Sequence, residues 1–595
     1  MRTEATSIYG YMIRSGTVRY RCGSESGDVD VSIGRPPRSN GTDLTAWCSL
    51  SAENGGLRAT LLVKNLLGLP VEILSARLET NLFLPSSARV FANGWQSRSA
   101  SGLVRIADGL PSPRFARAPD LACGDYALVR YGPGRVHSWT YTWFRSSGRF
   151  SFAGALDESI AFTRFEFAAV SSRGPASLSV HADCEGLVLP PLPKSSTSPQ
   201  TPCRLADVFL IYGEEEPCVA GYFDLRRRTR REPGGRKSLH RTPGAPALAW
   251  DGGPDAELPG GAEDVASLLA PFRTLEIPLD YLFLGGHSPC AEISCDGSGG
   301  PVLKALAPLF ADVRAAGVLP GLSLSPFVCP RRSSFYIERK EFLAQDARGR
   351  LLRVGSYGSP DGPLYVLDFY RPAYRRHLEQ VFRALSAAPG VGILRLSHLH
   401  AATLLGGAGT GRTRAQALQD AIRLLQDLCG PLPMVAADVP LGAVFDAVGY
   451  ASVAPPASPA LYGGLLQPRL RERGGVEEVI RTLAGRRHLD GRAFRSDPGP
   501  FTLRRPRRPS DETDGRRLFL ACTLFGGLLS TSDAVSGYTS AALGRFRDVV
   551  LRRGTRLYDK RVHAVTEKPD GSMLVEYELR GERLEAGIDP PTRKR

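Results

Sequence analysis

No apolar run in the sequence reaches the ~18 residues that a helix needs to cross a bilayer. The first residues, MRTEATSIYGYMIRSG, also lack the continuous apolar stretch of a secretory signal peptide. The 11 cysteines are an odd number with irregular spacing, which suits reduced thiols better than a disulfide framework. These absences predict a soluble, cytoplasmic protein with no membrane partner.

Motifs that hold metals or organic cofactors are also missing. There is no HExxH, no acidic triad, and no second pair to match the closely spaced Cys290 and Cys295. No GxGxxG follows a first strand, which argues against a dinucleotide site and against an open doubly wound sheet. We therefore expect no metal and no cofactor.

Positive charge is plentiful, with a formal net charge of +15, but it is not concentrated in one module. Arginine greatly outnumbers lysine, which is typical of a coding bias, and the arginines are not interleaved with aromatic residues. A basic surface favours acidic partners in general. Without aromatic platforms for bases, however, the pattern predicts no nucleic-acid partner.

Residues 1–224 read as an antiparallel β-sandwich. Short runs of alternating polar and apolar residues, such as LRATLLVKNL and SWTYTWFR, are separated by Gly, Pro, Asn and Ser turns. One turn, FANGWQSRSASG, carries Trp95, which fits an ordinary hairpin with a packed aromatic ring. Residues 225–246 are rich in Arg, Gly and Pro and are predicted to be an exposed linker.

From residue 247 to 535, buried strands alternate with amphipathic helices. The strands include LDYLFLGG, GLSLSPF, LYVLDF, GILRLS and PMVAADVP. Helices between them carry the expected end signals, such as Pro372 in a first turn and Gly317 at an end. This rhythm predicts a (β/α)8 barrel, whose chemistry would lie at the carboxyl ends of the strands. Residues 536–595 are predicted to form a short β element, with a hairpin at a Pro-Asp-Gly turn, and a tail.

Several stretches resemble motifs of the α-galactosidases of glycoside hydrolase family 36, the melibiase-like enzymes. FANGWQSRS resembles NGWQSWS, GLSLSPF resembles GLWLAPF, ILRLSHLHAATLLGG resembles LKLDFLYAAALEG, and GRAFRSDPGPFTLRR resembles RLWLNDPDCLLVR. Five further stretches match in the same order: LAWDG, IPLDYLFLGG, LYVLDFYRPAYRRHL, VAADVPLGAVFDAVGYASVAP and FGGLLSTSD. Together they run from Phe91 to Asp533, and they imply common ancestry and a carbohydrate-related function.

The chain departs from the family at the positions that carry the chemistry. The nucleophilic Asp of KLDF corresponds to Ser397, and the region of the acid/base Asp corresponds to the segment around Ser452, which has no carboxylate. The Asp-Asp pair that holds sugar hydroxyls corresponds to Gly285 and Gly286, and the Lys before the nucleophile to Arg395. A retaining glycosidase needs two carboxyl groups about 5 Å apart. The resemblance therefore implies a catalytically impaired protein with no intact catalytic residue.

Residues that the resemblance places near a bound sugar are Trp95, Trp250, Asp368, Arg395 and Asp497. Asp368 and Asp438 follow strands and are the candidates for replacement acids. The competing interpretation of both is a helix N-cap or loop carboxylate that accepts hydrogen bonds from backbone amides.

Three functions remain open at this point. The first is an inactive family member that retains sugar binding, with galactoside-like carbohydrate as its ligand. The second is an active glycoside hydrolase with relocated carboxylates, drawn from Asp368, Asp438 or Asp497. The third is an interaction scaffold, because the NGWQ-bearing region of such enzymes often lies near the active site of a neighbouring subunit; that arrangement predicts a homo-oligomer.

Overall fold

The computed structural model describes most of the chain in segments. These are residues 11–37, 43–110, 124–125, 128–146, 148–169, 171, 174–191, 201–230, 244–252, 262–289, 300–355, 362–387, 390–455, 475–503, 509–533, 535–550 and 560–591. The two closely spaced cysteines, Cys290 and Cys295, lie outside the described residues. Within the described part, no helix is long and apolar enough to cross a membrane.

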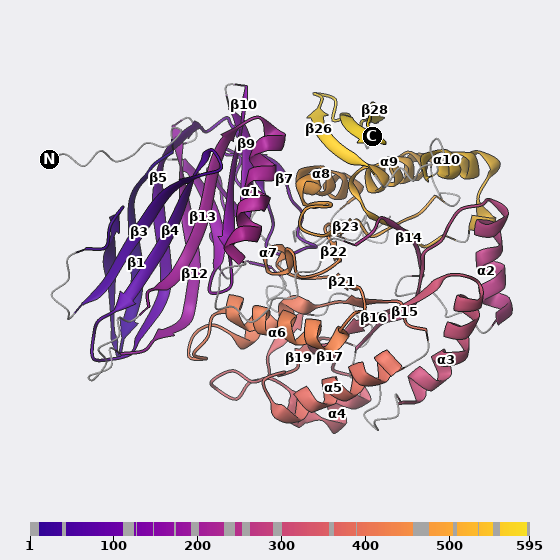
Figure 1. The fold of residues 1–595 in the computed structure, drawn as a ribbon, viewed down its shortest axis with the longest axis horizontal. Helices are drawn as coiled ribbons and strands as arrows, with labels where there is room; N and C mark the ends of the chain where they lie inside the picture. The colour runs from indigo at the N-terminus through magenta and orange to yellow at the C-terminus, as the bar shows by residue number, and fades with distance from the viewer. Residues whose placement is uncertain are drawn as a thin grey trace.

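The N-terminal region forms one nearly closed, barrel-like sheet, with 13 strands in the part of the chain described (Figure 1). Its strands are β1 (Ile13–Cys22), β2 (Glu25–Ile33), β3 (Leu44–Glu53), β4 (Gly56–Asn65), β5 (Val71–Pro85), β6 (Arg89–Ala92), β7 (Gly102–Arg105), β8 (Arg135–Trp139), β9 (Tyr141–Ser146), β10 (Arg149–Asp157), β11 (Phe162–Ala169), β12 (Pro175–Leu189) and β13 (Cys203–Gly213). The hydrogen-bonded order is β7-β6-β9-β10-β13-β4-β3-β2-β1-β5-β12-β11-β8. Neighbours are antiparallel except β2 and β3, which confirms the expected antiparallel region.

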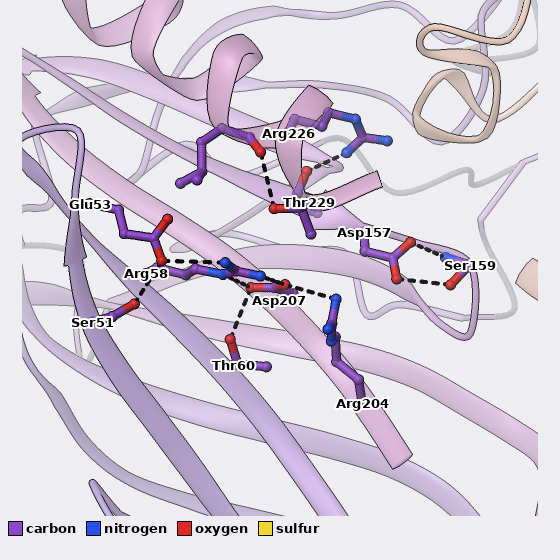
Figure 2. A network of polar contacts seen from close by, with 12 residues as sticks. Ser51, Glu53, Arg58, Thr60, Asp157, Ser159, Arg204, Asp207, Arg226 and Thr229 are labelled. Atoms are coloured by element: carbon purple, nitrogen blue, oxygen red, sulfur yellow. Dashed lines mark hydrogen bonds and ion pairs between the residues drawn. The ribbon is translucent and has the colours of Figure 1, made fainter. Parts of the chain in front are cut away.

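Alternation of side chains explains why these residues form strands. In β4, every second residue from Leu57 is buried in the interior of the sheet, as a half-buried strand requires. One polar network also lies in the sheet (Figure 2). Arg58 donates from Nε and Nη2 to the fully buried Asp207 at 3.0 and 2.7 Å, and Thr60 Oγ1 donates to it at 3.1 Å. The paired guanidinium and carboxylate tie β4 to β13.

Helix α1 (Glu215–Arg230) follows the sheet and packs on β10 (Figure 1). Tyr222 donates from its hydroxyl to the carbonyl of Ala155 at 2.7 Å. The first residues of the expected linker, 225–230, therefore belong to a helix, because the apolar face of α1 continues into them; residues 231–243 lie outside the description.

A second, parallel sheet is curled and follows α1 in the chain (Figure 1). Its strands, in the order β23-β22-β21-β20-β16-β15-β14-β25-β24, are β14 (Ala247–Asp251), β15 (Tyr281–Pro289), β16 (Leu319–Ser325), β20 (Ile393–Leu396), β21 (Met434–Ala436), β22 (Tyr450–Ser452), β23 (Arg495–Asp497), β24 (Pro500–Phe501) and β25 (Leu528–Thr531). The backbone amide of Gly527 donates to the carbonyl of Ser496 at 2.9 Å, which joins the approach to β25 with β23.

Helices and short helical turns connect these strands. The helices are α2 (Ala262–Thr274), α3 (Gly300–Ala315), α4 (Ser334–Glu338), α5 (Pro372–Ala387), α6 (Arg414–Cys429), α7 (Leu441–Val444), α8 (Val476–Arg486) and α9 (Pro509–Phe525), and the 3-10 turns are η3 (Lys340–Phe342), η4 (Leu399–Leu405), η5 (Arg487–Leu489) and η6 (Val535–Gly537). The start of α6 shows why a helix begins there. Thr413 and Gln416 form a capping box, in which each side chain accepts from the other residue's backbone amide.

One predicted strand of the parallel sheet is elsewhere. LYVLDF contains β19 (Leu364–Val366), which pairs antiparallel with β17 (Val328–Pro330) and β18 (Arg353–Gly355) in a separate three-stranded sheet. Its apolar run fits a buried strand of a parallel or of an antiparallel sheet, so the sequence pattern alone could not show to which sheet the strand belongs.

Helix α10 (Ser540–Val550) precedes the last sheet, which contains β26 (Arg561–Glu567), β27 (Met573–Leu579) and β28 (Glu582–Ile588). Figure 1 shows this sheet in yellow beside α8 and α9. The predicted hairpin is present between β26 and β27, and a third antiparallel strand extends it. The turn is the expected one, with Gly571 at a φ of 85°.

Candidate functional site

The carboxyl ends of the parallel strands bring together most of the predicted site residues. Strand β20 ends at Leu396, and Ser397 and His398 follow it directly. His398 has a φ of 56°, so the chain turns sharply and enters η4. The strand therefore stops at Leu396, and the segment after the turn is a 3-10 helix.

Arg395 is buried between two carboxylates at the centre of this end of the sheet. Its Nη1 donates to Asp251 at the end of β14, and its Nη2 lies 3.5 Å from Oδ2 of Asp497 at the end of β23. The guanidinium also stacks over the ring of Phe283, 4.1 Å from the centroid. Burial alone would lower the pKa of Arg395, but the two carboxylates outweigh it and raise the pKa above its usual value.

Asp497 is further engaged by its neighbours. Ser452 Oγ donates to its Oδ2 at 3.0 Å, and the backbone amide of Gly499 donates to its Oδ1 at 3.0 Å. The structure therefore brings Arg395, Ser452 and Asp497, all predicted site residues, into one network. In that network Ser452 supports a carboxylate and does not replace one.

Asp438, after β21, is held by a second arginine. Arg98, in the loop between β6 and β7, pairs with its Oδ1, and the backbone amide of His398 donates to its Oδ2 at 3.0 Å. Burial favours the neutral form, but Arg98 and the neighbouring His398 and His400 outweigh it and lower the pKa of Asp438 to about 2. The carboxylate is thus ionised at neutral pH.

The loop from Asn93 to Ser101 connects the N-terminal sheet to this end of the parallel sheet. Arg486, at the end of α8, is fully buried and donates to Asn93 Oδ1 at 2.9 Å and to the carbonyls of Gln96 and Val453. The amide of Ser97 donates to the carbonyl of Val439 at 2.8 Å. These contacts hold Arg98 beside Asp438.

Serine and histidine side chains fill the next part of the site. Ser325, at the end of β16, lies with its Oγ 3.0 Å from Nδ1 of His398. Ser397 is fully buried, and its backbone amide donates to the carbonyl of Leu324 at 2.8 Å. The left-handed backbone conformation of His398 directs its ring toward Ser325.

Asp368 lies apart from these networks. It follows β19 in the small antiparallel sheet, accepts from the amide of Tyr370 at 3.0 Å, and pairs with Arg371 at 3.3 Å. These contacts are those of a loop carboxylate in the turn before α5, which accepts from a backbone amide and pairs with a neighbouring arginine. No contact joins Asp368 to Arg395 or Asp438.

The two tryptophans occupy different places. Trp250 lies in β14, directly before Asp251 in the sequence. Its Nε1 donates to the backbone carbonyl of Asp533 at 3.1 Å. Trp95 packs edge-on against Trp139 and Phe162, each 4.8 Å away between ring centroids, in the core. These contacts agree with the interpretation of Trp95 as an ordinary aromatic side chain packed in the core.

Three residues of the site were not singled out from the sequence. Asp251 directly follows Trp250, which the resemblance places near a bound sugar. Its position at the end of a strand was the feature of the sequence that could have identified it as a site residue. Arg98 stands where the motif NGWQSWS has its second Trp. Ser325 stands where the motif GLWLAPF has Ala. Substitutions inside matching motifs were thus the signal for both.

The chemistry of this arrangement follows from its ion pairs. Retaining hydrolysis of a glycoside needs an ionised carboxylate free to attack and a protonated carboxyl group free to donate. Asp251 and Asp497 share Arg395, and Asp438 pairs with Arg98. Asp533 accepts from the amide of Leu503 and from the hydroxyl of Tyr538. Each of these four carboxylates is therefore held by an ion pair or by hydrogen bonds. Among the described residues, no group of three or more His, Cys, Asp or Glu could hold a metal ion.

Comparisons with known proteins place the fold. No family model matches the chain, and no curated protein matches it. The α-galactosidase TtGalA from Thermus thermophilus, solved in complex with p-nitrophenyl α-D-galactopyranoside, matches with a TM-score of 0.62 and 19% identity over 93% of this chain and 99% of that chain. The GH36 α-galactosidase AgaA from Geobacillus stearothermophilus matches with a TM-score of 0.52 and 11% identity over 95% of this chain and 79% of that chain. The chain therefore has the fold of the GH36 α-galactosidases.

Proposed function

We propose that this chain is a divergent member of glycoside hydrolase family 36 that binds a galactoside-like carbohydrate without hydrolysing it. In this proposal the parallel sheet is the (β/α)8 barrel of residues 247–535, residues 1–224 are the N-terminal β-sandwich, and the sugar lies at the carboxyl ends of the strands. Support comes from the shared fold and from the nine motif stretches between Phe91 and Asp533.

The observation that carries the proposal is the position of Arg395 between Asp251 and Asp497. A permanently charged guanidinium can neither give nor take a proton in catalysis. It also forms ion pairs with both neighbours, so neither carboxylate is free to act on a substrate while Arg395 stays in place. The nucleophile-equivalent position holds Ser397, whose hydroxyl acts as a nucleophile only when a base activates it.

Retention of sugar binding is supported by the donors of the same site. Arg395 Nε is buried and has no acceptor among the described residues. Buried N–H groups are almost always satisfied, and a sugar hydroxyl oxygen is a suitable acceptor. The related structures include TtGalA in complex with stachyose and a doubly substituted AgaA in complex with raffinose. Those ligands define the class of sugar to test.

The test is isothermal titration of raffinose into the full chain. We expect saturable heat from the wild type and at least a tenfold weaker affinity in Asp497→Asn, which loses the carboxylate that holds Arg395. Asp346→Asn, which alters a half-buried carboxylate paired with the exposed Arg350, is the matched control and should bind as the wild type does. Absence of heat from the wild type at millimolar raffinose would refute retained binding.

A second candidate, an active glycoside hydrolase with relocated carboxylates, is favoured by one observation. Asp251 and Asp497 lie on either side of one guanidinium, so two carboxyl groups are close together at the strand ends. If movement of Arg395 freed them, they could act as the pair that the mechanism requires. Turnover of p-nitrophenyl α-D-galactopyranoside that disappears in both Asp251→Asn and Asp497→Asn would establish this candidate in place of the first.

A further inference from the structure

A cavity of about 530 Å3 lies at the opposite end of the parallel sheet from the candidate sugar site. One wall comes from the segments that lead into β23 and β25, where Arg492 and Phe525 line it. The other wall comes from the C-terminal sheet, where Arg561 begins β26 and Arg580 follows β27. Barrel chemistry occurs at the carboxyl ends of strands, so this cavity is a separate feature.

The lining of the cavity is strongly basic. Six of its thirteen residues are Lys or Arg and two are Asp or Glu. Lys and Arg make up 75 of the 595 residues, so thirteen residues drawn at random would include about two. The general arginine content of the chain therefore does not account for this concentration. The six cations are Arg487, Arg492, Arg495, Lys560, Arg561 and Arg580.

Carboxylates behind the lining fix these cations in place. Glu216 accepts from Arg492 on both oxygens, at 2.9 and 2.6 Å, and also pairs with Arg561. Glu215 pairs with Arg487. A guanidinium has five N–H donors in a rigid plane, so an arginine held by one carboxylate keeps donors for a second acceptor. Arg487, Arg492 and Arg561 are thus oriented before a ligand arrives.

Charge and shape point to one class of ligand. The lining has four more cations than acids, and the two glutamates behind it reduce that excess to two. A phosphate monoester carries about −1.5 to −2 charges at neutral pH and accepts paired hydrogen bonds from guanidinium groups. The cavity volume lies in the range of small-molecule sites. Phe525 is the single aromatic residue of the lining, which offers no row of platforms for stacked bases.

We propose that this cavity binds a small molecule bearing a phosphate monoester. The phosphate lies between Arg492, Arg561 and Arg580, and the remainder of the molecule occupies the space toward Leu524 and Phe525. The site is independent of the sugar site, since the two lie at opposite ends of the parallel sheet. It joins the parallel-sheet region to the C-terminal sheet, so an occupied site also stabilises that junction.

The experiment is isothermal titration of the full chain with glucose 6-phosphate, with glucose as the neutral counterpart and inorganic phosphate as the minimal probe. The test variant is the double substitution Arg561→Gln/Arg580→Asn. Glu216 keeps Arg492 in this variant, and Asn tolerates the φ of 55° at position 580. The control is Arg350→Gln/Arg423→Gln, which removes the same charge from exposed positions.

We expect glucose 6-phosphate and inorganic phosphate to bind, glucose to bind at least tenfold more weakly, and the affinity for both phosphates to fall about tenfold for each guanidinium removed. The control should retain the wild-type affinity, and thermal unfolding of all variants should begin at the same temperature in the absence of ligand. Equal affinity of the wild type and the test variant would overturn the proposal. So would an equal loss in the control, or binding of a short RNA without binding of either phosphate.

Discussion

Replacement of Arg395 by methionine tests the network at the strand ends. Arg395 is 7% exposed, and its two carboxylate partners, Asp251 and Asp497, are 5% and 1% exposed. Removing one member of a buried ion pair costs about 3–5 kcal/mol, because the remaining charge is left uncompensated. Here two carboxylates lose their shared cation, and the contact with the Phe283 ring is lost as well.

The assay is differential scanning calorimetry at pH 7.5, because a chain of several domains does not unfold in two states. At roughly 2 °C per kcal/mol, Arg395→Met should lower the unfolding temperature of the parallel-sheet region by about 6–10 °C. Arg395→Lys keeps the charge and loses the second N–H···O contact, so its loss should be smaller. A shift of less than about 1 °C for Arg395→Met, as for an ordinary surface substitution, would refute the ion-pair account.

Three further substitutions test other buried groups. The pKa of Asp438 is lowered to about 2, so its ionised form stabilises the fold at any pH above the pKa of an unfolded Asp, and this contribution is lost as the pH falls toward 2. Asp438→Asn should therefore flatten the decline in unfolding temperature between pH 4 and pH 2. Burial lowers the pKa of His377 to about 4, so the fold loses stability as pH falls from about 6.5 to 4; His377→Phe, which keeps the ring among Phe335 and Tyr374, should remove that loss. Asp207→Asn leaves Arg58 without its buried carboxylate and should cost about 3–5 kcal/mol, measured by urea unfolding of the N-terminal sheet, while Asp108→Asn at an exposed pair should leave the unfolding midpoint unchanged.

The stretch from Gly392 to Gly407 shows how far the sequence alone predicts this fold. The buried run GILRL correctly predicts β20, since four consecutive buried residues between turn signals suit a strand of a parallel sheet. The direction of His398 could not be predicted, because it depends on a left-handed backbone conformation that is rare for residues other than glycine. Its contact with Ser325 follows from that conformation.

The ion pairs of the site were beyond sequence reasoning for a different reason. Arg98 and Asp438 are 340 positions apart, and only the packing of the β6–β7 loop against α8 and β21 brings them together. The proposed loss of the catalytic carboxylates rests on Ser397 and on the segment around Ser452, which the motif resemblance aligns with the family's two catalytic positions. Neutralisation of the remaining carboxylates by two arginines required the structure.

Asp368 illustrates the limit of motif comparison. A carboxylate after a strand fits both a catalytic acid and a loop acid that caps a helix. Its contacts with Tyr370 and Arg371 are those of a loop acid in the turn before α5, and the strand before it belongs to the small antiparallel sheet. Strand membership depends on pairing with distant segments, which single-strand patterns do not encode.

Release of p-nitrophenol from p-nitrophenyl α-D-galactopyranoside by the full chain is the most direct measurement of the central claim. The wild type and Ser397→Asp should be assayed together, with Asp497→Asn as the comparison. We expect no release above the level of Asp497→Asn from either protein, because Ser397→Asp restores one carboxylate and leaves no proton donor at the Ser452 side of the site. Turnover by the wild type that Asp497→Asn abolishes would contradict the claim that the fold persists without the hydrolytic chemistry.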